Sequence, residues 1–129
     1  MDSSQTGNLS KLKSIDEISM VVDDLRTQGK KLVMAHGVFD LLHMGHVLHL
    51  KSAKSEGDIL FLSITADQFV NKGPGRPVFS HHIRAEMLAA LEYVDFVIIN
   101  MAIHIKLFYL NKLSTTFADD NTPGIPAPG

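Results

Sequence analysis

The residues best suited to chemistry in this sequence are two histidines in the run His43-Met44-Gly45-His46. Histidines three positions apart at a helix start share one face, and each imidazole can donate a hydrogen bond to a phosphate oxygen. The glycine between them leaves room for a phosphate chain. A polyphosphate bound there would favour the charged imidazolium, which donates from both ring nitrogens. The pattern therefore indicates a site for an anionic ligand.

The turn before these histidines would add backbone donors to the same nucleotide-binding site. Gly37 lets a ligand approach the main chain, and Val38 follows it. Phe39 is expected to pack in the core with its N–H available to the ligand. The helix that begins near His43 presents free N–H groups and the positive end of its dipole. Asp40 would repel phosphate, so we expect it to stabilise the turn or cap the helix.

Candidate substrate-binding residues follow farther along the chain. Lys72 and Arg76 flank the glycine-proline loop in Asn71 to Pro77 and could neutralise a triphosphate or an acceptor phosphate; an ordinary solvated basic loop is the alternative. Arg84 lies in the first turn of a helix, where the dipole disfavours a cation, which suggests that it serves a bound anion; surface solvation is the alternative. Asp67 could accept from a substrate hydroxyl or make an Asx turn.

A metal site is the competing use of the histidines, because His43, His46 and His49 recur every three residues. No H-E-x-x-H motif or cysteine supports it, so we expect no protein-bound metal. The patterns G-x-x-x-x-G-K-[ST] and G-x-G-x-x-G are also absent, so phosphate handling would depend on the H-x-G-H motif. The other histidines receive no role: His36, His81, His82 and His104.

Alternating strands and helices must position these residues. Apolar spacing predicts helices that begin after Ser14, near His43 and after Ser80. The predicted strands are 31–35, 59–64 and 96–99. This alternation predicts an α/β fold with a Rossmann-like parallel sheet and right-handed crossovers. Such sheets bind ligands at the carboxyl ends of their strands, where the candidate residues fall.

Local signals predict the ends and the buried faces of the three helices. Ser14 and Glu17 have the spacing of a capping box, and Gly57 occupies the usual place of a left-handed C-terminal cap. The inward stripes are expected at Ile15, Ile18, Val22 and Leu25, then at Val47, Leu50 and Ala53, and finally at Ile83, Met87, Leu91 and Val94.

Composition favours one small globular unit, since the chain has 129 residues, 45% hydrophobic and 20% charged. Zero cysteines exclude disulfides, and a net charge of −2 does not favour nucleic acid as a partner. The N-terminus lacks the apolar core of a signal peptide, and no apolar run is long enough to span a bilayer. We therefore expect a cytoplasmic protein with no membrane partner.

The patterning divides the chain into four segments. We expect a flexible N-terminus over 1–13, an α/β domain over 14–100, an ambiguous segment over 101–117 and a disordered tail over 118–129. An open sheet edge at 96–99 would promote association, so the sequence predicts a homodimer or poor solubility.

These residues resemble a known family. The run 35–46 looks like the G-x-F-D-x-x-H-x-G-H signature of the cytidylyltransferase-like nucleotidyltransferases. The likeness extends through 65–67, 71–77 and 84–91 to Asp95. Within the family, the chain is most similar to the adenylyltransferase module of ADP-heptose synthases and related sugar-kinase fusions. The family's Lys-Gly and Ile-Ser-[Ser/Thr]-[Ser/Thr] segments are not evident after residue 100, so this H-x-G-H-type fold looks truncated.

The resemblance implies a reaction in which a sugar or polyol phosphate attacks the α-phosphorus of ATP or CTP and releases pyrophosphate. Mg²⁺ would hold the polyphosphate. His43, His46 and Lys72 would be the catalytic residues, while Gly37, Phe39 and Gly45 shape the pocket; these roles come from the family.

By the same resemblance, Arg84 supports the acceptor side and Asp67 lines the acceptor pocket. A catalytically inactive or partner-dependent nucleotide-binding remnant is the second hypothesis. A fragment of a class I aminoacyl-tRNA synthetase shares the H-x-G-H motif, but a K-M-S-K-S-like loop and a basic tRNA-binding region are absent here.

Overall fold

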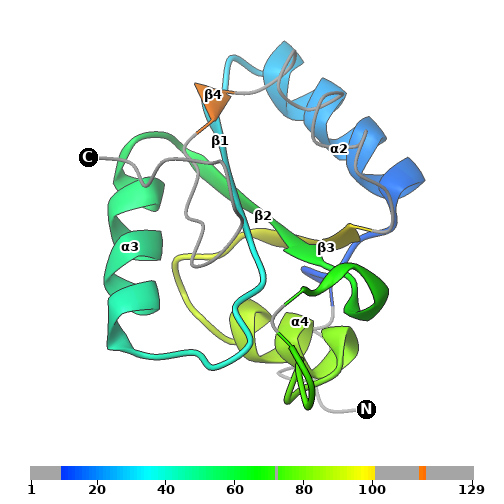
Figure 1. Ribbon diagram of the computed structural model, residues 1–129. Coiled ribbons are helices and arrows are strands. Elements are labelled where there is room, and N and C mark those ends of the chain that lie inside the picture. Colours follow the sequence, from blue (N-terminus) through cyan, green and yellow to red (C-terminus); the bar gives the residue numbers. More distant parts are fainter. Residues whose placement is uncertain (1–9, 72, 101–113, 116–129) are drawn as a thin grey trace, which may run out of the picture.

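Helices and strands alternate along the chain in the computed structural model, which describes residues 10–71, 73–100 and 114–115 (Figure 1). The helices of this part are α2 (Ile15–Thr27), α3 (Met44–Ser55) and α4 (His81–Ala89), with a short 3-10 helix, η1 (Asp67–Phe69). The strands are β1 (Leu32–Gly37), β2 (Ile59–Thr65), β3 (Phe96–Asn100) and β4 (Ser114–Thr115). The predicted α/β order is confirmed.

The strands form one parallel sheet in the order β3-β2-β1-β4. Met34 of β1 lies opposite Phe61 of β2, and Phe61 lies opposite Phe96 of β3. β2 and β3 extend the sheet on one side of β1, whereas β4 pairs on the other side, so the strand order reverses at β1. In open α/β sheets, the crevice beyond the carboxyl ends at such a reversal is the usual ligand site.

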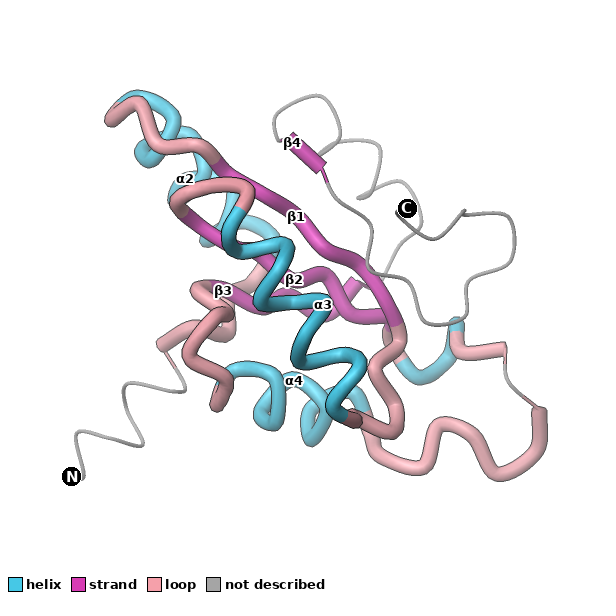
Figure 2. The backbone as a smooth tube through the Cα atoms, turned by 90° about the vertical axis from the view of Figure 1, so that its left-hand side faces the viewer, coloured by secondary structure: helices cyan, strands magenta, loops and turns pink. Residues whose placement is uncertain are grey.

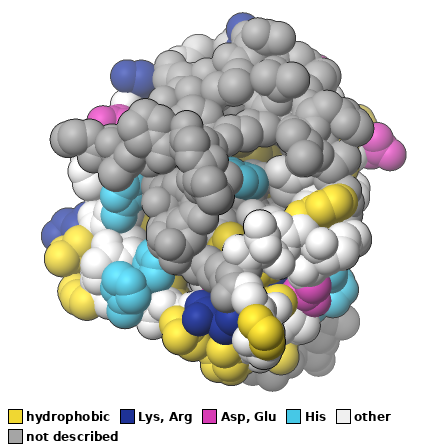
Figure 3. All heavy atoms as spheres, in the orientation of Figure 1, with side chains coloured by type: hydrophobic (Ala, Val, Ile, Leu, Met, Phe, Trp, Pro, Cys, Tyr) yellow, Lys and Arg dark blue, Asp and Glu magenta, His cyan; other side chains and the backbone are white. Residues whose placement is uncertain are grey.

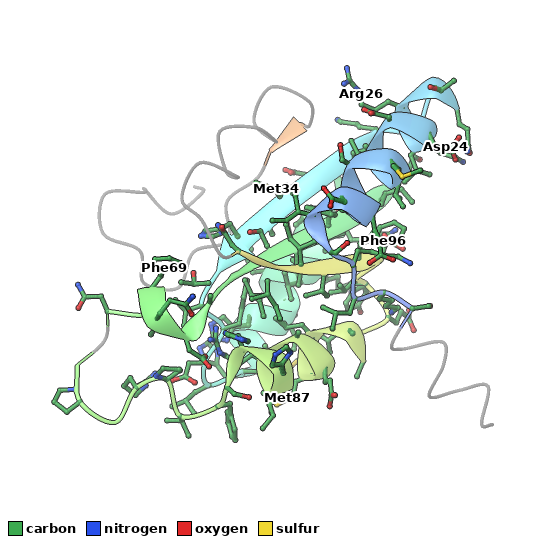
Figure 4. All side chains as sticks on the ribbon, turned by 90° about the vertical axis from the view of Figure 1, so that its right-hand side faces the viewer. Asp24, Arg26, Met34, Phe69, Met87 and Phe96 are labelled. Carbon is green, nitrogen blue, oxygen red and sulfur yellow. The ribbon has the colours of Figure 1, made fainter. Side chains whose placement is uncertain are left out.

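Helices cover both faces of this sheet (Figures 1 and 2). α2 packs on one face, where Ile18 and Val22 meet Met34 and Phe61; Figure 4 shows Met34 on the side of the sheet that faces α2. α3 and α4 pack on the opposite face, with a core that includes Val33, Ala35, Leu50, Leu62, Leu88 and Val97. Burial on both faces explains why the strands are almost continuously apolar in sequence.

The predicted capping box begins α2. The Ser14 hydroxyl accepts from the Glu17 N–H at 3.2 Å, and the Glu17 carboxylate accepts from the Ser14 N–H at 3.0 Å. Ile18 and Val22 are buried as expected, whereas Ile15 is 38% exposed, so the buried stripe begins one turn later than predicted. Gly29 follows the helix with a φ of 80°.

The prediction of a left-handed cap at Gly57 is wrong. The positive-φ glycines of the described chain are Gly29, Gly73 and Gly75. Gly57 is instead required for space, because a Cβ there would lie 2.6 Å from the Val33 side chain and 2.9 Å from the Lys31 carbonyl oxygen. The missing side chain lets the end of α3 cross close to the start of β1.

The predicted inward stripe is wrong within α4, whereas beyond the helix Val94 is buried in the core as predicted and Leu91 packs against it. α4 ends at Ala89 and buries Arg84, Ala85, Leu88 and Ala89. Ile83 is 46% exposed, and Figure 4 shows Met87 on the side of α4 away from the sheet. The two alanines allow close approach to the sheet, and hydrogen bonds compensate the burial of Arg84, so the helix is turned relative to its apolar pattern.

The edge of β3 is covered, which contradicts the predicted open edge at 96–99. Val97 donates its N–H to the Lys11 carbonyl at 2.9 Å and accepts from the Lys13 N–H at 2.9 Å. Leu12 forms an isolated parallel bridge with Val97 and packs against the core. The stretch from Lys11 to Lys13 therefore folds onto the sheet, and the predicted homodimer loses its structural basis.

The predictions of a flexible N-terminus, an ambiguous segment and a disordered tail fall largely on 1–9, 101–113 and 116–129, which lie outside the described residues. Ser114 and Thr115 form β4 opposite Val33 and Met34. No helix in the described ranges is long and apolar enough to cross a bilayer.

Candidate functional site

The turn between β1 and α3 places the two motif histidines at the carboxyl edge of the sheet. His43 is the N-cap of α3, and His46 lies in the first turn. The His43 Nδ1 accepts from the Gly45 N–H at 3.0 Å, and the His46 Nδ1 accepts from the His43 N–H at 3.2 Å. The ring centroids are 3.9 Å apart. The two imidazoles thus form a reciprocal cap, in the manner of a capping box.

This cap assigns the tautomer of both rings. Each Nδ1 accepts a backbone hydrogen bond and so carries no proton, which leaves the proton of the neutral imidazole on Nε2. The predicted doubly donating imidazolium would break the cap, because two N–H groups would then face each other. Each neutral ring therefore carries its proton on Nε2, and His46 is buried, with 7% exposure. The His43 ring lies at an exposed position, from which its Nε2–H can reach a ligand.

The Phe39 ring packs against the His46 ring. The Phe39 side chain is 1% exposed and meets the His46 ring edge-on, with centroids 5.5 Å apart. Its φ of 51° lies in the left-handed region, which costs a non-glycine residue about 1–3 kcal/mol. The predicted packing of Phe39 in the core is confirmed. Strain of this kind concentrates at functional sites, where the surrounding structure holds it.

Gly45 makes room for the His43 ring. A Cβ at Gly45 would lie 2.8 Å from the His43 Cε1 and 3.0 Å from its Nδ1. The sequence predicted space for a phosphate chain between the histidines, whereas the structure fills that space with the ring itself. The Gly45 N–H is not one of the predicted free amides, because it donates to His43.

Asp40 is buried, with 0% exposure, against the loop that precedes α4. It accepts from the N–H groups of Val78 and Phe79 and from the Nε of Arg76 at 2.6 Å. Burial alone would raise the pKa of Asp40, but these donors outweigh burial and lower that pKa below its ordinary value. The residue does not cap α3; it stabilises the loop that ends at α4.

Arg84 is a buried clamp. Its side chain is 0% exposed and donates to the carbonyls of Val38 at 2.9 Å, Thr65 at 2.8 Å and Phe79 at 3.0 Å, and to the Asp67 carboxylate at 2.7 Å. The surface alternative is therefore wrong. Because these donors serve protein acceptors, we revise Arg84 from a substrate ligand to a positioning residue that joins three segments at the sheet edge.

Asp67 lies on the rim of this edge with a 36% exposed side chain. One carboxylate oxygen is held by Arg84, and the Phe69 N–H, which an Asx turn would direct to this carboxylate, donates to the Ala66 carbonyl at 3.0 Å instead. The other carboxylate oxygen is 3.5 Å from the His81 Nδ1. That nitrogen accepts from the Asp67 N–H at 3.0 Å, so the contact is not a charged pair. His81 is a supporting residue that the sequence analysis missed, since spacing along the chain gave no sign of it.

The structure brings most of the predicted site residues to one edge. Gly37 ends β1 and is buried, as is Val38. Figure 3 shows histidine side chains gathered over the side of the molecule where α3 lies. Lys72 lies outside the described residues. Across the described ranges, no three histidine or acidic side chains are grouped as metal ligands would be.

Known proteins share sequence with the part of this chain that carries the site. The family described as cytidylyltransferase-like matches residues 34–118. The bifunctional protein HldE of Sulfurimonas denitrificans is 47% identical over 89 residues, which are 67% of this chain and 19% of that protein. The HldE of Campylobacter fetus subsp. fetus is 44% identical over 101 residues, or 77% of this chain and 21% of that protein. This chain thus corresponds to a small part of each relative.

A solved structure shows the same arrangement. The lipopolysaccharide core biosynthesis protein from Thermoplasma volcanium superposes with a TM-score of 0.58 and 31% sequence identity. The match covers 65% of this chain and 69% of that protein.

Proposed function

Because the chain belongs to the cytidylyltransferase-like family, we propose that it is a nucleotidyltransferase acting on a nucleoside triphosphate and a phosphorylated sugar or polyol. The observation that carries this proposal is the reciprocal imidazole cap of His43 and His46 at the strand-order reversal beside β1. It offers the Nε2–H of the exposed His43 ring and a helix N-terminus where a phosphate chain would bind.

The reaction we propose is attack by the acceptor phosphate on the α-phosphorus of the triphosphate, with pyrophosphate leaving. Such chemistry depends on positioning and on stabilising charge in the transition state. Both rings are fixed by backbone donors, so the exposed His43 Nε2–H can stabilise that charge without reorganising, and His46 holds the His43 backbone in place. Lys72 and Arg76 add positive charge in this proposal, and Asp67 faces the acceptor.

Mg²⁺ would enter with the triphosphate. Asp40 accepts from Arg76 and two amides, and one oxygen of Asp67 accepts from Arg84. The described part of the site therefore does not supply a pair of carboxylates for a resident cation. This fits Mg²⁺ carried on phosphate oxygens, where it neutralises charge on the triphosphate.

ATP is the preferred nucleotide of this proposal, with CTP second. The acceptor class is supported by the description of the Thermoplasma volcanium protein, which places that protein in lipopolysaccharide core biosynthesis. The cytoplasmic location remains a prediction.

The second candidate is a protein that binds nucleotide without turnover or needs a partner for it. The match covers 19% and 21% of the two HldE proteins, so similarity alone does not assign their whole activity to this chain.

Pyrophosphate release tests the two candidates. The full chain is incubated with Mg²⁺, ATP or CTP, and heptose 1-phosphate, beside His43→Ala and His46→Ala variants. We expect release that needs every component and falls about 10²-fold or more in each variant, the usual cost of removing one transition-state donor. Nucleotide binding without release would support the second candidate. Absence of both, or full activity in both variants, would overturn the assignment.

A further inference from the structure

We propose that Asp40 is a positioning residue that orients Arg76 to bind a ligand phosphate at the turn that carries the motif histidines. This inference rests on the proposed function and adds a role for a carboxylate that does not itself touch the ligand. It starts from the unequal use of the two Asp40 oxygens. Oδ1 accepts from the N–H groups of Val78 at 2.9 Å and Phe79 at 3.1 Å, whereas Oδ2 accepts from the Arg76 Nε at 2.6 Å and from Val78 at 2.9 Å.

The Arg76 side chain is held at only one of its nitrogens. Within residues 10–71, 73–100 and 114–115, Asp40 is its one side-chain partner, through Nε. The side chain is 29% exposed, and within the same residues no hydrogen bond engages its terminal nitrogens. A guanidinium is planar and rigid, and fixing Nε therefore fixes the plane in which the other N–H groups lie. Such a fork matches the oxygens of a phosphate.

The location of the pair favours a ligand role over a loop tie alone. Asp40 follows Phe39, whose left-handed backbone forms the turn, and precedes His43 by three residues. The loop is already anchored to Asp40 by two amides, which do not need the arginine. A cation added to that anchor is preorganised, and preorganisation lowers the entropic cost of binding an anion.

Three substitutions separate the role of the Arg76 cation from that of Asp40. Asp40→Asn can keep Oδ1 as acceptor for the two amides, but it places an NH₂ donor where Oδ2 faced Arg76. Arg76→Gln removes the cation at a partly exposed position. Arg76→Lys keeps the charge as a single nitrogen, which cannot contact Asp40 through one N–H and phosphate through a separate pair. Circular dichroism of each variant verifies the fold.

Calorimetric titration of the full chain with Mg²⁺ measures the effect, in one arm with ATP and in another with glucose 1-phosphate. We expect Asp40→Asn, Arg76→Gln and Arg76→Lys each to weaken binding by about tenfold in the same arm, since a lost charge-assisted hydrogen bond has that magnitude. The affected arm identifies whether the phosphate belongs to the nucleotide or to the acceptor. The double variant Asp40→Asn/Arg76→Gln should bind no worse than either single variant.

Additive losses in the double variant would refute a role for Asp40 through Arg76. Unchanged binding in both arms for Arg76→Gln and Arg76→Lys would refute the inference even if Asp40→Asn failed to fold. His43→Ala keeps the two proposals apart. If it abolishes ATP binding while the Arg76 variants bind normally, the proposed function stands and this inference fails. A wild-type chain that binds neither probe would overturn both.

Discussion

Replacing Arg84 with methionine should destabilise the whole sheet edge. The substitution keeps a long apolar stem but removes every donor of the guanidinium. Three carbonyl oxygens, from Val38, Thr65 and Phe79, then lose a donor at a site with 0% exposure, and the Asp67 carboxylate loses its cationic partner. Exchanging a buried ion pair for apolar residues can be neutral when both partners are replaced, but here the acceptors remain.

The size of the loss follows from these contacts. Leaving a buried carbonyl oxygen without a donor costs about 1–3 kcal/mol, so the loss of all three donors should cost at least about 3 kcal/mol. The Asp67 contact adds little to this, because that side chain is 36% exposed and solvent screens it. A domain of this size has a total stability of about 5–15 kcal/mol, so the variant should lie close to its folding limit. At about 4–8 °C for each kcal/mol, the midpoint should fall by at least about 12 °C.

Urea and thermal unfolding, followed by circular dichroism, measure this loss. Glu86→Met is the matched control, because Glu86 is exposed on the same helix and is not among the partners of the Arg84 side chain in the described residues. The control should change the free energy of unfolding by no more than about 0.5 kcal/mol. A loss below about 1 kcal/mol for Arg84→Met would show that the clamp contributes no more than an ordinary hydrogen bond, and the positioning role would have to be abandoned.

Three other variants test separate features. Gly45→Ala should weaken ATP binding about tenfold in calorimetry, because the new Cβ displaces the His43 ring from its cap and with it one donor. The lowered pKa of Asp40 gives stability that is present above its unfolded value of about 4 and is lost as the pH falls through the lower folded value; urea unfolding at pH 6 and pH 3 should show less acid sensitivity in Asp40→Asn than in wild type. Lys13→Pro removes the N–H that covers Val97, so light scattering should detect concentration-dependent association that wild type lacks.

Much of the fold could be predicted because its signals are local. The capping box of Ser14 and Glu17 and the apolar runs of the strands depend on residues near each other in sequence. The face of α4 could not be predicted in this way. It depends on the burial of Arg84, which becomes favourable only when carbonyls from three other segments converge on it.

In the candidate site, too, contacts between residues close in sequence could be predicted, whereas contacts between residues far apart in sequence could not. The H-x-G-H motif places both rings on one helix turn, so spacing alone indicated their proximity. The partners of Asp40 and Asp67 lie 36 and 17 residues away in sequence, in Arg76 and Arg84, and no periodicity joins them. Spacing did not reveal that both histidines use Nδ1 as a hydrogen-bond acceptor. Their rings accept hydrogen bonds from the backbone of their own turn, and a prediction based on the charge of a nearby phosphate does not take those bonds into account.

In the reciprocal cap, the His43 ring both stabilises the start of α3 and can contact a ligand. A helix is capped well by aspartate or serine, and His43→Asp would supply such an oxygen to the Gly45 amide. That change would yield a sturdier first turn and remove the ring that can meet a ligand. Helix stability and ligand binding therefore favour different residues at position 43, as at any site where one side chain both stabilises the fold and contacts the ligand. A variant selected for heat resistance alone should drift away from histidine here, whereas one selected for turnover should retain it and tolerate a less stable helix.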